Sequence, residues 1–223
     1  LAAIALSRQG HEVGILDADI TGPSIPKMFG ISGPPAMSEN GILAVTSRSG
    51  IEVMSINLLL PAEDDAVIWR GPLIGHAITQ FWEDVLWGKL DYLIVDLPPG
   101  TADAPLTVMQ QLPISGIIIV FTPQDLTNMV VRKAVKMARQ MNKAIIGVVE
   151  NMSYLYIPEI DKKMEIFGKS RGEEMSRAAG APLLGRFPID PALAKLCDEG
   201  NIERYTSEIY NTFAQELTGV LVK

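Results

Sequence analysis

Carboxylates stand at the ends of two short apolar runs, where a sheet protein can place side chains for chemistry. Val13 to Leu16 and Tyr92 to Val95 each predict a strand, and they run into Asp17-Ala18-Asp19 and Asp96. The second run has no polar interruption and predicts a central strand buried on both faces. Ligands of open α/β sheets bind at the carboxyl ends of the strands. An acid placed there can hold Mg²⁺ through water while a nucleotide's phosphates complete the site.

The turn that follows Asp96 favours the same chemistry. Pro98-Pro99-Gly100 can continue neither a strand nor a helix, and the Gly100 N–H is free to face a γ-phosphate. Acids gathered at one sheet edge need a cation or amide donors to be tolerated, and magnesium bound to a nucleotide supplies that charge. The alternative is that Asp17, Asp19 and Asp96 are ordinary solvated loop acids.

The sequence lacks the loop that cradles phosphates, G-x-x-x-x-G-K-[ST]. Gly168-Lys169-Ser170 has Lys163 where the first glycine should be, so it favours the opening of a surface helix. The chain begins at Leu1 inside a helix-forming run that ends at Gly10. We therefore expect an N-terminally truncated chain, with a first strand and a phosphate loop preceding Leu1. Such a fragment should bind ATP weakly, since backbone N–H groups and a lysine of that loop supply much of the affinity.

Composition excludes several classes of function. The 223 residues are 48% hydrophobic and carry a net charge of −7, which favours a well-packed core and disfavours a nucleic-acid surface. The single cysteine, Cys197, cannot form an intrachain disulfide or a four-cysteine metal site. No apolar run approaches the roughly 20 residues of a membrane-spanning helix, and nothing resembles a signal peptide. We expect a cytoplasmic protein without a membrane anchor.

Strands and helices alternate along the chain, which predicts a doubly wound, mostly parallel α/β sheet with helices on both faces. No linker or repeat interrupts it, so we expect one domain over residues 1–223. Two small hairpins are expected at Ile42–Thr46 with Ile51–Ile56 and at Tyr154–Ile157 with Lys163–Phe167. The further expected elements are strands at Ile117–Phe121, Ala144–Val149 and Leu183–Phe187, and helices at Pro26–Gly30, Pro72–Trp87, Asp103–Leu112, Asp125–Met141, Lys169–Ala179, Pro191–Cys197 and Thr206–Val222.

Several longer segments resemble the Mrp-type ATPases, which are MinD/ParA-like P-loop proteins and in many cases iron–sulfur cluster carriers. The resemblance covers nearly the whole chain, and its motifs occur in the family's order. They are Leu16-Asp17-Ala18-Asp19-Ile20-Thr21-Gly22-Pro23-Ser24-Ile25-Pro26, Asp96-Leu97-Pro98-Pro99-Gly100-Thr101-Ala102-Asp103, Thr122-Pro123-Gln124, Val149-Glu150-Asn151-Met152-Ser153, Ile166-Phe167-Gly168, Pro182-Leu183-Leu184-Gly185 and Pro188-Ile189-Asp190-Pro191.

The resemblance implies a slow Mg-ATPase that forms a homodimer around nucleotide, with a deviant Walker A loop upstream of Leu1. Asp19 would lie in the first switch and orient the attacking water or sense Mg²⁺, and Asp17 would support it. Asp96 matches the Walker B acid, which holds Mg²⁺ through water, and Gly100 matches the amide donor of the second switch.

The resemblance also implies a base-binding end. Asn151 matches the amide that reads adenine, and the loop from Pro188 to Pro191, which includes Asp190, would pack against the base. The alternative for Asn151 is a strand-end residue that caps its own turn. Arg70, in Trp69-Arg70-Gly71-Pro72, would bind phosphate or the partner subunit, and an ordinary surface arginine is an equal alternative.

One departure from the family concerns the cluster itself. Carriers follow this segment with a C-P-x-C pair, through which two subunits share a [4Fe–4S] cluster, whereas Ile157 and Ile160 stand at those positions here. Isoleucine cannot ligate iron, and Cys197 is expected to be a small half-buried side chain. Two hypotheses follow: an ATPase of iron–sulfur cluster assembly or carriage that meets scaffold or recipient proteins, or a MinD/ParA-like regulatory switch without a cluster.

Overall fold

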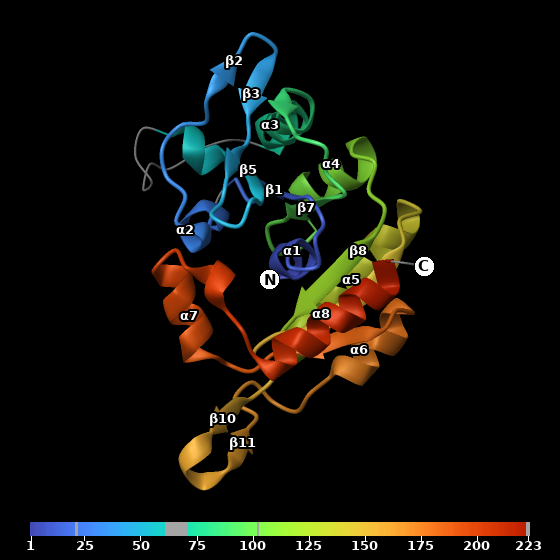
Figure 1. Cartoon of the computed structure of the whole chain (residues 1–223). Coiled ribbons are helices and arrows are strands. Elements are labelled where there is room, and N and C mark those ends of the chain that lie inside the picture. The colour runs from blue at the N-terminus through green and yellow to red at the C-terminus, as the bar shows by residue number, and fades with distance from the viewer. Residues whose placement is uncertain (21, 61–70, 102, 222–223) are drawn as a thin grey trace. The chain divides into compact units, whose positions relative to one another are not determined.

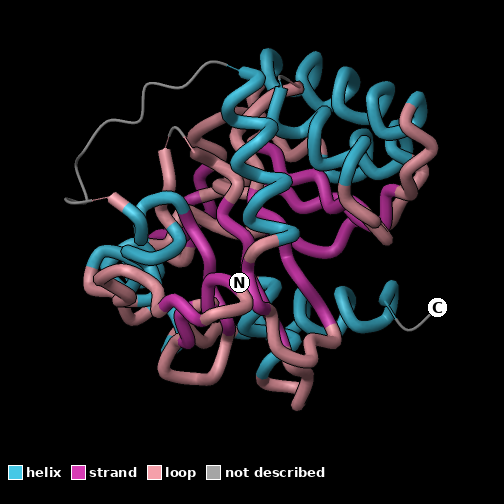
Figure 2. Tube along the Cα trace, turned by 90° about the horizontal axis from the view of Figure 1, so that it is seen from above, coloured by secondary structure: helices cyan, strands magenta, loops and turns pink. Residues whose placement is uncertain are grey.

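The computed structural model describes residues 1–20, 22–60, 71–101 and 103–221. They form two compact units, which Figure 1 labels by element and Figure 2 colours by type of secondary structure. The first unit is made of Leu1–Leu112 and Leu193–Tyr205, and the second of Pro113–Ala192 and Thr206–Lys223. The single domain over residues 1–223 stays a prediction.

The first unit is built on a four-stranded sheet. Its order is β4 (Val45–Thr46), β5 (Glu52–Ser55), β1 (Val13–Asp17) and β7 (Tyr92–Asp96). β1 runs parallel to both β5 and β7, whereas β4 pairs antiparallel with β5. All five residues of β1 are buried, and β1 has a parallel neighbour on each side.

The position expected for β7 is wrong within the described part of the chain. β7 lies at the end of its sheet, beside β1, and its residues are half-buried instead of buried on both faces. An apolar run shows that a strand can be covered, but it does not show how many neighbours the strand has.

Shorter elements complete the first unit. The helices α3 (Gly71–Glu83) and α4 (Asp103–Gln111) pack against each other. The others are α1 (Ala2–Ser7), α2 (Ile25–Phe29), the 3-10 helices η1 (Ile56–Leu59) and η3 (Ile202–Arg204), the strands β2 (Met37–Ser38), β3 (Gly41–Leu43) and β6 (Val85–Leu86), and α7 (Pro191–Asp198), which begins in the second unit.

Two expected boundaries are wrong here for the same reason. The helix predicted to reach Trp87 ends at Glu83, because Val85 and Leu86 form β6 and pair in parallel with β3. The hairpin predicted for Ile42–Thr46 keeps only Val45–Thr46 paired with β5, since β3 joins β2 and β6 in a separate sheet. Tertiary pairing overrides local pattern at both places.

The second unit contains a three-stranded parallel sheet in the order β12 (Leu183–Arg186), β9 (Ile145–Glu150), β8 (Ile117–Phe121). Helices α5 (Asp125–Gln140), α6 (Gly172–Ala179) and α8 (Glu208–Leu221) pack on it, with α8 against β12 and β9. A predicted hairpin is present as β10 (Leu155–Ile157), the 3-10 helix η2 (Pro158–Ile160) and β11 (Lys162–Met164). The mostly parallel α/β fold expected from the sequence is confirmed.

One hydrophobic cluster of the second unit lies between the sheet and the helices α5 and α6, and it is mainly aliphatic, with Phe121 of β8. Its buried members are Ile119, Phe121, Val131, Val135, Val148, Met175, Ala179 and Ala181. α6 begins at Gly172, three residues later than expected, because Ser170 and the Arg171 amide bond the carboxylate of Glu150. α8 begins at Glu208, where the Ser207 hydroxyl accepts a bond from the Tyr210 amide, 3.0 Å away.

Two glycines in the first unit meet where the chain has no room for a side chain. Gly30 ends α2 in the left-handed region at φ +62°, and Gly200 has φ +66°. A Cβ added to Gly30 would lie 2.7 Å from the Gly200 carbonyl oxygen. Gly10 has a similar backbone, φ +89°, but no atom lies within 4 Å of its would-be Cβ.

We predict that Gly30→Ala destabilises the protein more than Gly10→Ala. Both variants carry the cost of placing an L-residue in the left-handed region, about 1–2 kcal/mol. Gly30→Ala should lose roughly 1–3 kcal/mol more, because its methyl group collides with backbone. Urea unfolding of both variants measures the difference, and equal losses would contradict the close approach of Gly30 and Gly200.

Candidate functional site

The acids predicted at two strand ends meet at one edge of the first unit's sheet. Asp17 ends β1, Asp96 ends β7, and the parallel register places them directly opposite each other. The Ala18 amide donates to the Asp96 carbonyl at 2.8 Å, which extends the pairing one residue beyond the strands. Asp19 follows immediately, so the three predicted acids belong to one short stretch of sheet edge.

Asp17 is fully buried and is held by donors from three segments. The Ser55 hydroxyl donates to Oδ2 at 3.1 Å, and the amide of Ile25, at the start of α2, donates to the same oxygen at 3.3 Å. The Asp19 amide donates to Oδ1 at 3.3 Å. The side chain therefore ties β5, α2 and the loop after β1 together, which disagrees with the alternative of a solvated loop acid for Asp17.

Burial and mutual repulsion raise the pKa values of two of these acids. Burial, and then the neighbouring Asp96, raise the pKa of Asp17 from 3.8 to about 6, although the bonds from Ser55, Ile25 and Asp19 act in the opposite direction. Burial, and then the charge of Asp19, raise the pKa of Asp96. The edge therefore holds more negative charge than its surroundings compensate, and a cation would relieve it.

The loop that contains Asp19 is held by hydrogen bonds, whereas the loop that contains Gly100 is open to solvent. The Gly22 amide donates to Oδ1 of Asp19 at 3.1 Å, so this half-buried carboxylate lies in a tight turn after β1. Gly100 is exposed at φ +96°, with no atom within 4 Å of a would-be Cβ. Its surroundings leave space for a bulky group near the backbone.

The acidic edge is not a complete metal site. Among the described residues, no group of three or more His, Cys, Asp or Glu side chains is arranged to hold a metal ion. Mg²⁺ keeps several waters and needs only one or two carboxylates when phosphates are present. The arrangement therefore fits magnesium that arrives with a nucleotide better than a permanently bound ion.

The predicted base-binding residues lie at the carboxyl edge of the second unit's sheet. Asn151 directly follows β9, and its amide donates to the Phe121 carbonyl at 2.7 Å. Its side-chain oxygen accepts a bond from the Met152 amide at 3.0 Å, and Met152 has φ +52°. Asn151 thus bonds its own turn, as in the alternative interpretation, and its role toward a base stays a prediction.

The second predicted base loop is fixed by main-chain bonds. The Ser153 amide donates to the Phe187 carbonyl at 2.8 Å, and the Ile189 amide donates to the Tyr154 carbonyl at 2.7 Å. Pro188, between these bonds, is half-buried. Asp190 accepts a bond from the Ala192 amide at 2.8 Å and so caps the first turn of α7. The loop that follows Asn151 and the loop that contains Pro188 therefore lie side by side.

Two polar residues near these edges lie outside the predicted set of site residues. Ser55 ends β5 opposite Asp17 in the register and donates to its carboxylate. Glu150 is a fully buried acid at the end of β9. Only the strand register shows that Ser55 faces Asp17. Glu150 ends an apolar run, as Asp17 and Asp96 do, but its donors Ser153, Ser170 and Arg171 are known only from the structure. Arg70 lies outside the described residues.

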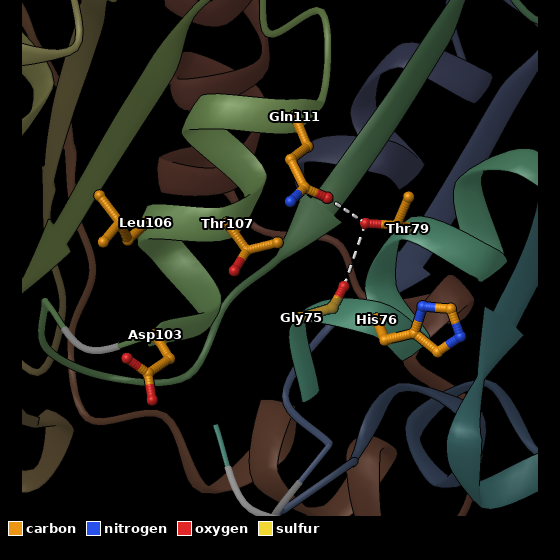
Figure 3. A pocket seen from close by; sticks show the side chains of 7 residues that line it. All are labelled: Gly75, His76, Thr79, Asp103, Leu106, Thr107 and Gln111. Atoms are coloured by element: carbon orange, nitrogen blue, oxygen red, sulfur yellow. Dashed lines mark hydrogen bonds between the residues drawn. The ribbon is translucent and has the colours of Figure 1, made fainter. Parts of the chain in front are cut away.

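A hollow of about 450 Å³ lies between α3 and α4 in the first unit (Figure 3). Its lining includes Asp103, Thr107 and His76, and the Thr79 hydroxyl bonds both Gln111 and, at 3.1 Å, the Gly75 carbonyl. None of the predicted site residues lines it. The hollow is therefore a separate feature of the α3–α4 pair.

The hairpin of the second unit carries no thiol at the family's ligand positions. Ile157 ends β10, and Ile160, with 62% of its surface exposed, ends η2. Cys197 lies on α7, and burial raises the pKa of its thiol, which disfavours the thiolate that ligates iron. None of the helices formed by the described residues combines the length and apolar character needed to cross a membrane.

Comparison with solved structures places this geometry in a class. The chain is 44% identical to a nucleotide-binding protein from Archaeoglobus fulgidus in complex with ADP, with a TM-score of 0.82 over 95% of this chain and 83% of that one. The cell division ATPase MinD of Pyrococcus furiosus has a TM-score of 0.69 at 18% identity, covers 98% of the chain, and supports the fold alone. The fold is that of the MinD/ParA-like P-loop NTPases.

The family follows from the sequence comparisons. Residues 1–221 match the ParA family described as NUBPL iron-transfer P-loop NTPase, and the chain belongs to this family. It is 45% identical over 216 residues to the iron-sulfur cluster carrier protein of Clostridium perfringens, covering 93% of the chain and 76% of the relative. It is 41% identical over 215 residues to the carrier of Aquifex aeolicus, covering 95% of the chain and 59% of the relative.

We predict that the contribution of Asp17 to the free energy of unfolding falls as the pH rises from about 4 to about 6. The folded-state pKa of Asp17, about 6, lies above its ordinary value of 3.8. In this range the folded protein therefore binds more protons than the unfolded chain, and deprotonation favours unfolding. Asp17→Asn lacks this proton. The wild type should therefore lose on the order of 2 kcal/mol relative to the variant across the range.

Urea unfolding of both proteins at pH 4, 5, 6 and 7 measures this difference. A difference in unfolding free energy that does not change with pH would contradict the raised pKa of Asp17.

Proposed function

We propose that the protein binds and hydrolyses Mg-ATP at the acidic edge of the first unit's sheet. The observation that carries the proposal is the juxtaposition of Asp17, Asp19 and Asp96 at the carboxyl ends of parallel strands, in a chain of a P-loop NTPase family. Two of these acids have pKa values raised by burial and repulsion. Magnesium on a triphosphate would relieve that repulsion and orient the nucleotide.

Each residue has a separate task in this proposal. Asp96 holds Mg²⁺ through water, and the amide of Gly100 donates to the γ-phosphate from an open loop. Asp19 orients the water that attacks the phosphorus. Asp17 accepts the Asp19 amide and fixes its loop, so it acts as a positioning residue. Catalysis then consists mainly of orientation and charge neutralisation.

The second unit carries the residues that the family resemblance assigns to an adenine base. Asn151 can both donate and accept at a base edge, and Pro188 to Pro191 form the loop proposed to pack against the base. The main-chain bonds between residues 153–154 and 187–189 support this assignment, because they join the two loops. The hydrogen bond of Asn151 to its own turn uses only the side-chain oxygen, toward Met152.

We expect Asp19→Ala to suppress ATP hydrolysis more than ATP binding. Loss of a group that orients the attacking water should lower kcat by about 10²- to 10³-fold. The Kd for Mg-ATP should change less than tenfold, because the phosphates and the base keep their contacts. Single-turnover hydrolysis and equilibrium titration of the full-length protein separate the two effects.

Glu83→Gln is a matched control, because Glu83 is an exposed acid of the same unit outside the edge. It should hydrolyse ATP at the wild-type rate. Unchanged turnover in Asp19→Ala would remove Asp19 from the mechanism, and loss of activity on adding excess EDTA should be reversed by Mg²⁺.

The wider role proposed is iron–sulfur cluster assembly or carriage, in which slow ATP turnover switches a homodimer. Relatives at 45% and 41% identity carry the name iron-sulfur cluster carrier protein, which supports this role over a switch unrelated to clusters. Scaffold or recipient proteins are the proposed partners, and a cytoplasmic location remains a prediction.

The manner of holding a cluster must differ from that of C-P-x-C carriers. One cysteine per chain supplies at most one of the four thiolates that a [4Fe–4S] cluster takes. Ile157 and Ile160 supply none. This observation is the basis of the second candidate, in which the ATP state controls a partner and the chain itself holds no cluster.

We predict that anaerobic reconstitution with iron and sulfide leaves the wild-type protein without a cluster. The double variant with Ile157→Cys and Ile160→Cys places thiols around the existing Pro158-Glu159 in the C-P-x-C pattern. It should gain the broad absorption near 400 nm that marks a [4Fe–4S] cluster. Optical spectra and iron content after desalting measure both.

Cys197→Ser provides the control for the remaining thiol. A wild-type cluster that disappears in Cys197→Ser would overturn the cluster-free interpretation and make Cys197 a ligand. A wild-type protein that stays colourless and still hydrolyses ATP would support the switch.

A further inference from the structure

Glu150 is an acid at the end of β9 with none of its surface exposed to solvent. Burying a carboxylate is costly unless hydrogen-bond donors replace the lost water. The proposed mechanism gives Glu150 no task. Its donors show what the residue does for its surroundings.

Three donors converge on the Glu150 carboxylate. The hydroxyls of Ser153 and Ser170 donate to Oε2 at 2.5 and 2.7 Å, and the Arg171 amide donates to Oε1 at 2.6 Å. These donors come from two segments, the turn after β9 and the residues just before α6. Glu150 is therefore the point at which the two segments are joined.

The first segment needs such a connection because its backbone is strained. Met152 has φ +52°, a left-handed conformation that a side chain other than glycine disfavours. The bond from Ser153 to Glu150 closes the turn across Met152 and Asn151. Asn151 therefore lies in a turn that begins at Glu150 and whose other end, Ser153, is bonded to the Glu150 side chain.

The second segment is anchored to both neighbouring helices. The Arg171 guanidinium pairs with Asp125, at the start of α5, and with Glu174 at 3.2 Å. Glu174 also pairs with Arg132 of α5 at 3.1 Å. The segment that donates to Glu150 is therefore fixed by ion pairs with α5 and α6. Because Glu150 also accepts the bond from Ser153, it connects this fixed segment to the turn that contains Asn151.

We propose that Glu150 is a positioning residue that sets the nucleobase selectivity of the protein through Asn151. The inference rests on the proposed function, since it assigns the orientation of the base-reading side chain. Its three donors keep the strained turn in one conformation, and Asn151 then meets a base without first ordering its own backbone. Loss of this support lets the turn relax and lowers the discrimination between adenine and guanine.

The test compares binding of Mg-ATP and Mg-GTP to the full-length protein and its variants by calorimetric titration. Glu150→Gln keeps the shape of the side chain but removes its negative charge, which weakens the hydrogen bonds of the Arg171 amide and of the two hydroxyls. The ratio of the Kd for GTP to that for ATP should fall about three- to tenfold, the effect of one hydrogen bond. The melting temperature should also fall.

A second variant, Ser170→Ala, removes a single donor and leaves the carboxylate in place. It should lower the same ratio by a smaller factor, and it provides the test if Glu150→Gln does not fold. Glu173→Gln is the matched control, because Glu173 is an exposed acid of α6 that pairs with Arg186. It should leave the ratio unchanged.

A double-variant cycle separates positioning from general stability. In the Asn151→Ala background, Glu150→Gln should have no further effect on the ratio, because the residue it positions is gone. An unchanged ratio in Glu150→Gln and in Ser170→Ala, together with a lower melting temperature, would make Glu150 structural only and overturn the inference. A wild type that does not prefer ATP, or an Asn151→Ala variant that keeps the preference, would instead overturn the proposed base site.

Discussion

The repulsion between acids at the end of β1 and β7 is the constraint around which the first unit is arranged. The parallel register pairs Asp17 with Asp96, so the two residues lie next to each other at the same edge of the sheet. The fold then needs donors for the buried one, which Ser55 and the amides of Ile25 and Asp19 supply. These donors compensate the negative charge only in part, because the pKa values of Asp17 and Asp96 stay raised.

The second unit solves a similar problem differently. Glu150 also ends a parallel strand and is as inaccessible as Asp17, and each carboxylate accepts three hydrogen bonds. The bonds to Glu150 are 2.5–2.7 Å long, whereas those to Asp17 are 3.1–3.3 Å long, and Asp17 also faces the acid Asp96. The length of the hydrogen bonds and the charge of the facing residue, and not burial alone, therefore separate a structural anchor from an acidic pair that is prepared for a cation.

Much of the fold could be predicted from the sequence, because apolar runs and glycine stops mark the strands and helices. The acidic edge could be predicted for the same reason, since Asp17 and Asp96 directly end such runs. The end position of β7 could not, because apolarity does not count neighbours. The late start of α6 could not either, because the bonds of Ser170 and Arg171 to Glu150 are set by a residue some 20 positions away.

The bond between Ser170 and Glu150 has a consequence for reading the segment Gly168-Lys169-Ser170 as a nucleotide-binding motif. The serine of such a motif coordinates magnesium through its hydroxyl oxygen. Here that hydroxyl donates its proton at 2.7 Å to a carboxylate with no access to solvent. Recruiting it to a metal would strip a donor from Glu150. Evolution could therefore convert this look-alike into a working phosphate loop only by first replacing the acid beneath it.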